Sequence, residues 1–134
     1  MSVTWNVTDN TDIFKAAFDR GIKAALHAVG EQAERNVAKL TPVGESYEGH
    51  RGGTLRQNIT NEVRGNSVFV GSPTEYAPYV ELGHRQTPGR YVPRLGKRLV
   101  ASYVPPKPFI KPGIEDHLGE YSELIVRYIK ENLP

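Results

Sequence analysis

One long stretch constrains the fold of this chain most, because its apolar residues recur at spacings of three and four. That spacing is typical of an amphipathic helix with one apolar face. Asn10 or Thr11 can cap the start of the helix, and Pro42 ends it because the residue before a proline avoids helical backbone. The apolar stripe consists of Ile13, Phe14, Ala17, Phe18, Ile22, Ala25, Leu26, Val29, Ala33, Val37 and Leu40.

The length of this helix and its two glycines allow two further predictions. About 28 residues at 1.5 Å each make a rod on the order of 40 Å, which is longer than a single domain of 134 residues usually needs. Gly21 and Gly30 lie inside it, and each costs about 1 kcal/mol relative to alanine. We therefore expect part of one face to remain free for a partner, and a bend or close packing at the two glycines.

A mainly polar arm, residues 1–10, precedes the helix, and Trp5 is its one large apolar group. We expect this arm to be flexible. Either Trp5 tucks against the fold of its own chain, or the arm docks it on a neighbouring subunit.

A β-hairpin is predicted after the helix. Leu55, Ile59 and Val63 are separated by polar residues, as in a half-buried strand. Gly65-Asn66 supplies a tight turn, and residues 68–70 return as a second strand.

The stretch that follows, residues 73–83, fits either a short helix or an irregular strand, since Pro78 argues against a central strand. We expect Tyr76, Tyr79 and Leu82 to lie mainly in the core.

A second amphipathic helix is predicted from Pro112, which suits a first helical turn. It most simply packs beside the hairpin against the first helix. Its apolar positions are Ile114, Leu118, Tyr121, Leu124, Ile125, Tyr128 and Ile129. The order of elements predicts a single domain, residues 1–134, with an α+β fold. A long N-terminal helix and a C-terminal helix pack on a small, mostly antiparallel sheet, with two long flexible loops at residues 42–54 and 84–108.

The second of these loops belongs to a basic segment, residues 84–111, with seven cations, five prolines and no acid. The prolines and glycines forbid a long helix, although Leu99–Val104 can add one strand. The cations, with Tyr91 and Tyr103, could meet nucleic-acid phosphates and stack on bases. A solvated loop and a surface for an acidic protein partner are the alternatives.

Composition and motifs argue against several other classes of protein. The chain has no cysteine, which excludes disulfides and thiolate metal sites and fits a soluble protein made in a reducing cytoplasm. No apolar run approaches the roughly 20 residues needed to cross a bilayer. Walker, dinucleotide-binding and nucleophile-elbow motifs are lacking. Glu81 and His84, with His50, form the nearest approach to a metal site, but such spacing often occurs by chance. We predict no metal, cofactor or catalytic residue.

Four motifs in a fixed order carry a resemblance to a known family. They are Leu40-Thr41-Pro42-Val43, the stretch Gly53–Ile59, the stretch Val70–Gly83 with Tyr76-Ala77-Pro78-Tyr79-Val80-Glu81, and Pro108-Phe109-Ile110-Lys111-Pro112. Together they resemble the tail-completion proteins of long-tailed phages, and within that family a siphophage tail-to-head joining protein. Two departures are an expansion over Glu45–Arg51 and the length of the basic segment after Gly83.

The resemblance implies structural work in the virion, with no catalysis and no cofactor. Members of this family cap the head-proximal end of the tail tube and let it join the head connector, typically as a six-fold ring. The implied partners are further copies of the chain, the tail tube protein and the head connector or stopper protein, with DNA passing near the ring lumen and no membrane. The implied location is the tail–head interface of the virion, after assembly in the host cytoplasm.

Both long loops become candidate assembly surfaces under this interpretation. The candidate contact residues are Tyr47, His50, Arg51, Arg85, Arg90, Tyr91, Arg94, Lys97 and Arg98. The alternative function is a small nucleic-acid-binding protein that uses residues 84–111.

Overall fold

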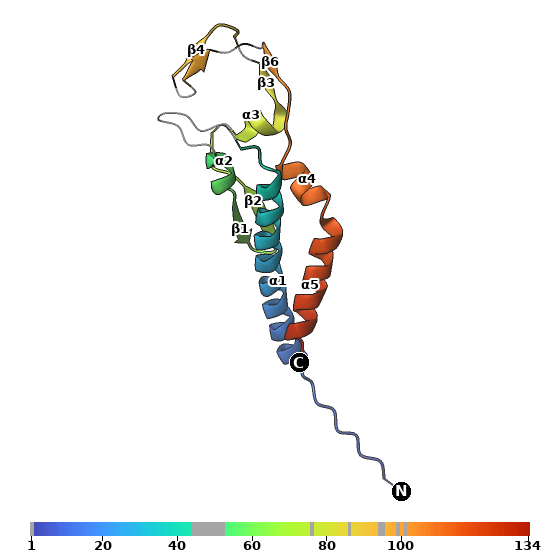
Figure 1. Cartoon of the computed structure of the whole chain (residues 1–134). Coiled ribbons are helices and arrows are strands. Elements are labelled where there is room, and N and C mark those ends of the chain that lie inside the picture. Colours follow the sequence, from blue (N-terminus) through green and yellow to red (C-terminus); the bar gives the residue numbers. More distant parts are fainter. Residues whose placement is uncertain are drawn as a thin grey trace.

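The computed structural model describes residues 2–43, 53–75, 77–85, 87–93, 96–98, 100 and 102–134. The molecule is elongated and is built along one helix, α1 (Thr11–Leu40) (Figure 1). The N-terminal arm extends away from one end of α1, and the segment after Gly83 protrudes beyond the other end. The long helix predicted from the apolar stripe is therefore confirmed.

Local sequence fixes both ends of α1. Its start is supported by Asp9, whose carboxylate accepts hydrogen bonds from the backbone N–H of Thr11 (2.9 Å) and from the Thr11 hydroxyl. Asn10 is the N-cap residue, one of the two positions predicted for the cap, but its side chain makes no capping hydrogen bond. The helix ends at Leu40, as Pro42 requires.

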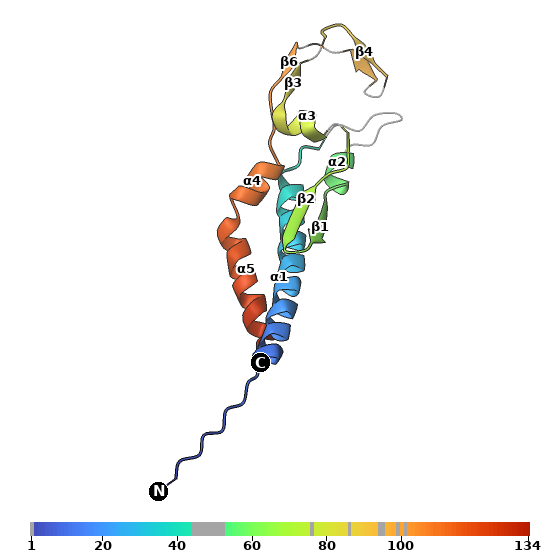
Figure 2. The same ribbon diagram turned by 180° about the vertical axis from the view of Figure 1, so that it is seen from behind.

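Two different elements cover α1 on opposite sides (Figure 2). One side carries α5 (Leu118–Asn132) and the other carries the hairpin of β1 (Thr60–Arg64) and β2 (Ser67–Gly71). The two helix glycines mark these contacts. A Cβ at Gly21 would lie 2.9 Å from the Ile129 Cα, and one at Gly30 would lie 2.6 Å from the Asn61 Oδ1. The glycines thus permit close packing, one of the two roles predicted for them.

The hairpin is antiparallel, and its register pairs Thr60 with Gly71 and Arg64 with Ser67. Gly65 in the turn has φ +57°, a value that favours glycine. The first strand is shorter than predicted, because Leu55 lies in a short helix, α2 (Thr54–Gln57). Leu55 and Ile59 were assigned to the strand from their apolar character, but their spacing of four also fits a helical turn.

The described residues between positions 77 and 104 form one helix and four very short strands. The helix is α3 (Ala77–Leu82), one of the two forms predicted for this stretch. The strands are β3 (His84–Arg85), β4 (Tyr91–Val92), β5 (Lys97–Arg98) and β6 (Tyr103–Val104). A single strand was expected here, over Leu99–Val104. The strands form two further antiparallel pairs, β3 with β6 and β4 with β5.

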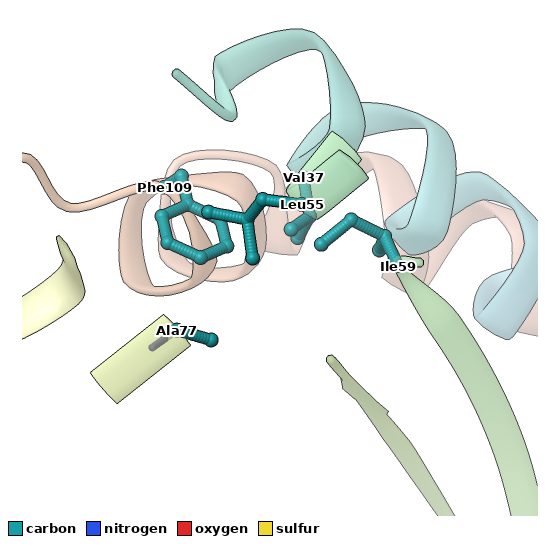
Figure 3. Packing of buried hydrophobic residues seen from close by; sticks show 5 residues of the cluster. All are labelled: Val37, Leu55, Ile59, Ala77 and Phe109. Carbon is teal, nitrogen blue, oxygen red and sulfur yellow. The ribbon is translucent and has the colours of Figure 1, made fainter. Parts of the chain in front are cut away.

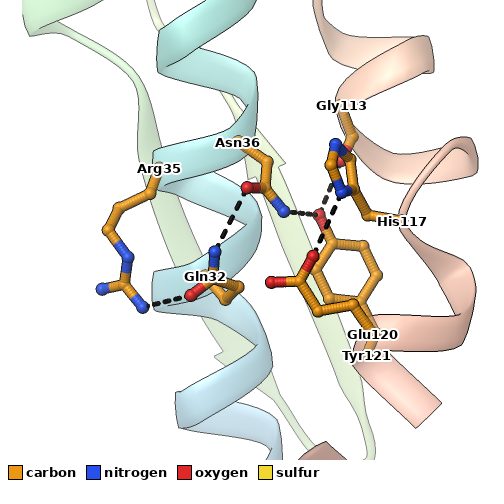
Figure 4. A network of polar contacts seen from close by, with 7 residues as sticks. All are labelled: Gln32, Arg35, Asn36, Gly113, His117, Glu120 and Tyr121. Atoms are coloured by element: carbon orange, nitrogen blue, oxygen red, sulfur yellow. Dashed lines mark hydrogen bonds and ion pairs between the residues drawn. The ribbon is translucent and has the colours of Figure 1, made fainter. Parts of the chain in front are cut away.

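The predicted C-terminal helix is divided into α4 (Ile110–Glu115) and α5. Gly113 lets α4 approach α1, since a Cβ there would lie 2.9 Å from the Val37 Cα. Farther along, a buried polar network ties α5 to α1 (Figure 4). The Asn36 amide donates to the Tyr121 hydroxyl (3.0 Å), which in turn donates to the Gly113 carbonyl (2.6 Å). Burial raises the pKa of this hydroxyl, helped by the Glu120 charge and opposed by the Asn36 hydrogen bond.

The apolar core lies at the C-terminal end of α1 (Figure 3). It joins residues from three helices and two residues that lie just outside helices, namely Val37, Leu55 and Ala77 with Ile59 and Phe109. Val37 and Phe109 are both 0 % exposed. The structure confirms the α+β class, and α1, α2, α3, α4 and, through Val70, the β1–β2 hairpin meet at this cluster.

One prediction about buried side chains is wrong, and one of the two placements considered for Trp5 is excluded. Tyr79 and Leu82 were expected in the core, but they are 56 % and 74 % exposed, because α3 buries the opposite side through Ala77. Trp5 is 84 % exposed and does not tuck against its own chain. Tyr76 lies outside the described residues.

Candidate assembly surface

The strand pair β4–β5 lies within the pair β3–β6 along the chain, so the described residues between positions 84 and 104 form one irregular hairpin, the basic hairpin. His84 pairs with Val104 at its base, and Tyr91 pairs with Arg98 farther out. Gly89 (φ +82°) and Gly96 (φ +66°) provide turns between the strands. The basic hairpin therefore projects from the end of the molecule opposite the arm (Figure 1).

The structure describes five of the nine predicted contact residues, all in the basic hairpin. Arg85, Arg90, Tyr91 and Arg98 are exposed, and Lys97 lies in β5. Tyr91 and Arg98 come together, with the guanidinium 5.9 Å from the ring centroid and donating to the Gly89 carbonyl (3.0 Å). The remaining four candidates, Tyr47, His50, Arg51 and Arg94, lie outside the described residues.

The charge of the chain is divided unevenly between this region and the rest. Residues 84–111 hold seven cations and no acid, which leaves ten basic and 15 acidic residues elsewhere, a net charge of −5 against +7. Among the described residues the ion pairs are Arg64–Glu62 and His117–Glu120, and neither involves the basic hairpin. The hairpin therefore presents positive charge to solvent or to a partner.

Glu81 joins the base of the basic hairpin to the start of α4 by hydrogen bonds to residues 109–111, a contact that we call the clamp. One oxygen of its carboxylate accepts the backbone N–H groups of Phe109 (2.8 Å) and Ile110 (3.0 Å), and the other accepts that of Lys111 (3.0 Å). These are the free donors at the start of α4, which an anionic side chain satisfies well. Because Glu81 precedes the hairpin and Phe109 follows it, the contact holds both ends of the segment together.

Two further contacts reinforce this clamp. The backbone N–H of Lys107 donates to the Val80 carbonyl (2.8 Å). Gly83 has φ +75°, and a Cβ there would lie 2.7 Å from the Val104 carbonyl oxygen, so a larger residue would collide with the returning chain. The sequence motifs around Glu81 and Phe109 therefore meet in space, where they anchor the basic hairpin.

The clamp keeps Glu81 ionised. Burial alone would raise the pKa of its carboxyl, but the three backbone donors and the nearby Lys111 charge outweigh that effect, and the pKa lies below its ordinary value. Sequence reasoning missed this role and considered Glu81 only as a possible metal ligand. The one available signal was that Glu81 lies just before the basic segment and Phe109 lies near its far end.

Other chemistry is sparse in the described part of the chain. No group of three or more His, Cys, Asp or Glu side chains that could hold a metal ion occurs among the described residues. His50, the third ligand considered with Glu81 and His84, lies outside them. An open hollow on the basic hairpin itself is lined by Arg85, Ser102 and Tyr103. None of the described helices is long and apolar enough to cross a bilayer.

Comparison with known proteins returned one family. The family model described as "Bacteriophage HK97-gp10, putative tail-component" matches residues 7–83, more than half of the chain. The match takes in α1, the β1–β2 hairpin and α3, and it ends where the basic hairpin begins. No curated protein and no solved structure matches the chain.

Proposed function

The chain belongs to the HK97-gp10-like family of bacteriophage tail components, and from this premise we propose that it completes the head-proximal end of the tail tube and joins the tail to the head connector. As a structural component of the tail, it would be assembled in the host cytoplasm and would reside in the virion at the tail–head interface. Its proposed partners are the tail tube protein, the connector or stopper protein and further copies of itself.

The observation that carries this proposal is the anchored basic hairpin. A protein that joins two assemblies needs a surface that projects beyond its own core and still keeps a defined orientation. The basic hairpin projects from the body, while Glu81 and Gly83 fix its base. Its described cations are available for acidic groups of a partner, because none of the ion pairs among the described residues involves them.

We further propose that copies form a closed, hexameric ring. A ring requires each copy to present two different lateral faces, since head-to-tail contacts that close generate cyclic assemblies. The two sides of α1 differ in this way, because one carries α5 and the other carries the β1–β2 hairpin. In such a ring the loop at residues 42–54, with Tyr47, His50 and Arg51, would share the contact surface with the basic hairpin.

Phage assembled without this protein test the proposal. We expect separate heads and tails by electron microscopy, and joined virions when the protein is supplied in trans. Complementation with Arg90→Glu/Arg98→Glu should restore few joined virions, whereas Arg20→Glu, an exposed position on α1, should restore them fully. Joined virions in the absence of the protein would refute the proposed function.

A nucleic-acid contact is the second candidate, favoured by the exposed Arg85, Arg90 and Arg98 beside Tyr91. In the ring these residues could face DNA passing through the lumen. Binding of the isolated protein to DNA, measured at increasing salt, separates the two roles. A phosphate-binding protein loses affinity steeply as salt rises, whereas a protein that contacts only proteins shows no binding at any salt concentration.

A further inference from the structure

The N-terminal arm has the pattern of a β-strand but pairs with no strand among the described residues of its own chain. Val3, Trp5 and Val7 alternate with polar residues and are 69 %, 84 % and 89 % exposed. In an extended chain, alternate side chains share one side, so the arm has one apolar side. Both views show it extending away from the body (Figures 1 and 2).

The outer edge of β2 is a suitable acceptor for such a strand. β1 covers one edge of β2, and no other described strand pairs with the opposite edge. All five residues of β2 are uncharged, and Phe69 is 51 % exposed on the face that points away from α1. Edge strands in soluble proteins usually carry charges that prevent pairing with another chain. β1 has Glu62 and Arg64, whereas β2 has no such protection.

The arm cannot place Trp5 beside the β2 of its own chain. Trp5 lies six residues before Thr11, so an extended chain carries it at most about 20 Å from the start of α1. The hairpin packs against Gly30, through Asn61 and Val68. Gly30 is 19 residues into the helix, about 28 Å from its start. The arm of a second copy has no such limit.

A helix face is a poorer acceptor than a strand edge. Ile13, Phe14 and Phe18 are 59 %, 49 % and 38 % exposed and lie within reach of the arm. However, a helix has already used its own backbone groups, so an arm lying on it would bury N–H and C=O groups without partners. A strand edge accepts those groups and the apolar side chains together.

We propose that the arm of one copy adds as a third strand to the outer edge of β2 in a second copy, with Trp5 beside Phe69. Aromatic pairs on neighbouring strands stabilise a sheet. The contact joins two different surfaces, so it can pass from copy to copy around a ring. The inference rests on the self-association included in the proposed function.

Cross-linking tests the contact directly, because the chain has no native cysteine. The variants Val3→Cys and Val7→Cys are each mixed with Ser67→Cys, so that any disulfide between different variants must join two copies. If Trp5 lies beside Phe69, Val7 lies near Ser67 in an antiparallel arrangement and Val3 does so in a parallel one. We expect one of the two mixtures to give several times the yield obtained with Ser122→Cys, an exposed control on α5. Equal yields would overturn the inference.

Fluorescence gives a second, independent readout, since Trp5 is the only tryptophan. Association of the copies, measured by sedimentation, should move the emission of Trp5 to shorter wavelength. Phe69→Ser should reduce both the association and this shift in emission, while Phe14→Ser should leave both unchanged. Association with unchanged emission, or a chain that stays monomeric at every concentration, would overturn the inference. Association without the Ser67 cross-link would refute the arm contact but leave the proposed function intact. Joined phage formed without the protein would refute that function and not the contact.

Discussion

The two ends of α1 come from the same apolar stripe but have opposite environments. At the C-terminal end, Val37 is completely buried and packs in a cluster with Phe109 and Leu55. At the N-terminal end, Phe14 and Phe18 stack on each other, with ring centroids 6.2 Å apart, and remain partly exposed. The β1–β2 hairpin, α2, α3 and α4 all lie near the C-terminal end of α1 (Figure 1). Apolar periodicity therefore marks a helix face, while the neighbouring elements decide whether that face becomes core.

Replacing one phenylalanine at each end of α1 by alanine should give the largest difference in stability between the two ends. Phe109→Ala removes a fully buried side chain from the cluster and should lower the free energy of unfolding by about 3–5 kcal/mol. Phe14→Ala, at a side chain that is 49 % exposed, should cost about 1 kcal/mol or less. Denaturant unfolding of both variants measures the difference. Similar losses would mean that the free end of α1 is as well packed as the core.

The buried polar network of Asn36, Tyr121 and Gly113, which adjoins Val37 at the buried end of α1, should show an intermediate effect. Tyr121→Phe removes the hydroxyl that donates to the Gly113 carbonyl and accepts from Asn36. Leaving these buried groups without a partner should cost about 1–3 kcal/mol. Tyr103→Phe is the matched control, because Tyr103 is 53 % exposed, and it should have little effect. Thermal unfolding compares the two variants, and equal stability would show that the network contributes nothing measurable.

The clamp at the base of the basic hairpin should give a smaller, local effect. Glu81→Gln removes the charge that accepts three backbone N–H groups, at a cost of about 1 kcal/mol for a partly exposed site. Hydrogen exchange should accelerate at Phe109, Ile110 and Lys111 and not in the middle of α1. Glu75→Gln, at an exposed position just before α3, serves as the control. Unchanged exchange at residues 109–111 would rule out the clamp.

Acidification should weaken the same clamp, with the smallest effect on the whole molecule. The pKa of Glu81 in the folded protein is below its ordinary value of 4.5, so the folded state favours the ionised carboxylate. Its stabilisation is complete above that ordinary value and is lost as the pH falls through the lower pKa of the folded state. The difference in stability between wild type and Glu81→Gln should therefore shrink below about pH 4.5. A constant difference down to low pH would contradict this account.

Local patterns predicted the elements better than they predicted burial. The stripe from Ile13 to Leu40 and the stop at Pro42 were enough for α1, and Gly65-Asn66 was enough for the turn of the hairpin. Tyr79 and Leu82 were misassigned to the core because hydrophobicity does not say which side of a six-residue helix meets the body. The four short strands of the basic hairpin were also missed. Two-residue strands are too short to show a period.

At the candidate assembly surface, too, the sequence predicted the features that depend on composition and missed those that depend on contacts between distant residues. The positive charge of residues 84–111 is a property of the sequence, and it identified Arg85, Arg90 and Arg98 as surface residues before their exposure was known. The clamp by Glu81 could not be predicted, because its partners lie 28 to 30 positions away along the chain. No local propensity reports a contact at that distance.

The sequence by itself determined the length of α1, the turn at Gly65 and the separation of +7 from −5 charge, since each depends only on residue type and spacing. The tertiary structure decided which end of α1 is buried, and it joined Glu81 to the start of α4. It also left Trp5 and the β2 edge exposed. The physical reason is that burial and hydrogen bonding depend on which distant segments meet, and that meeting is a property of the whole fold.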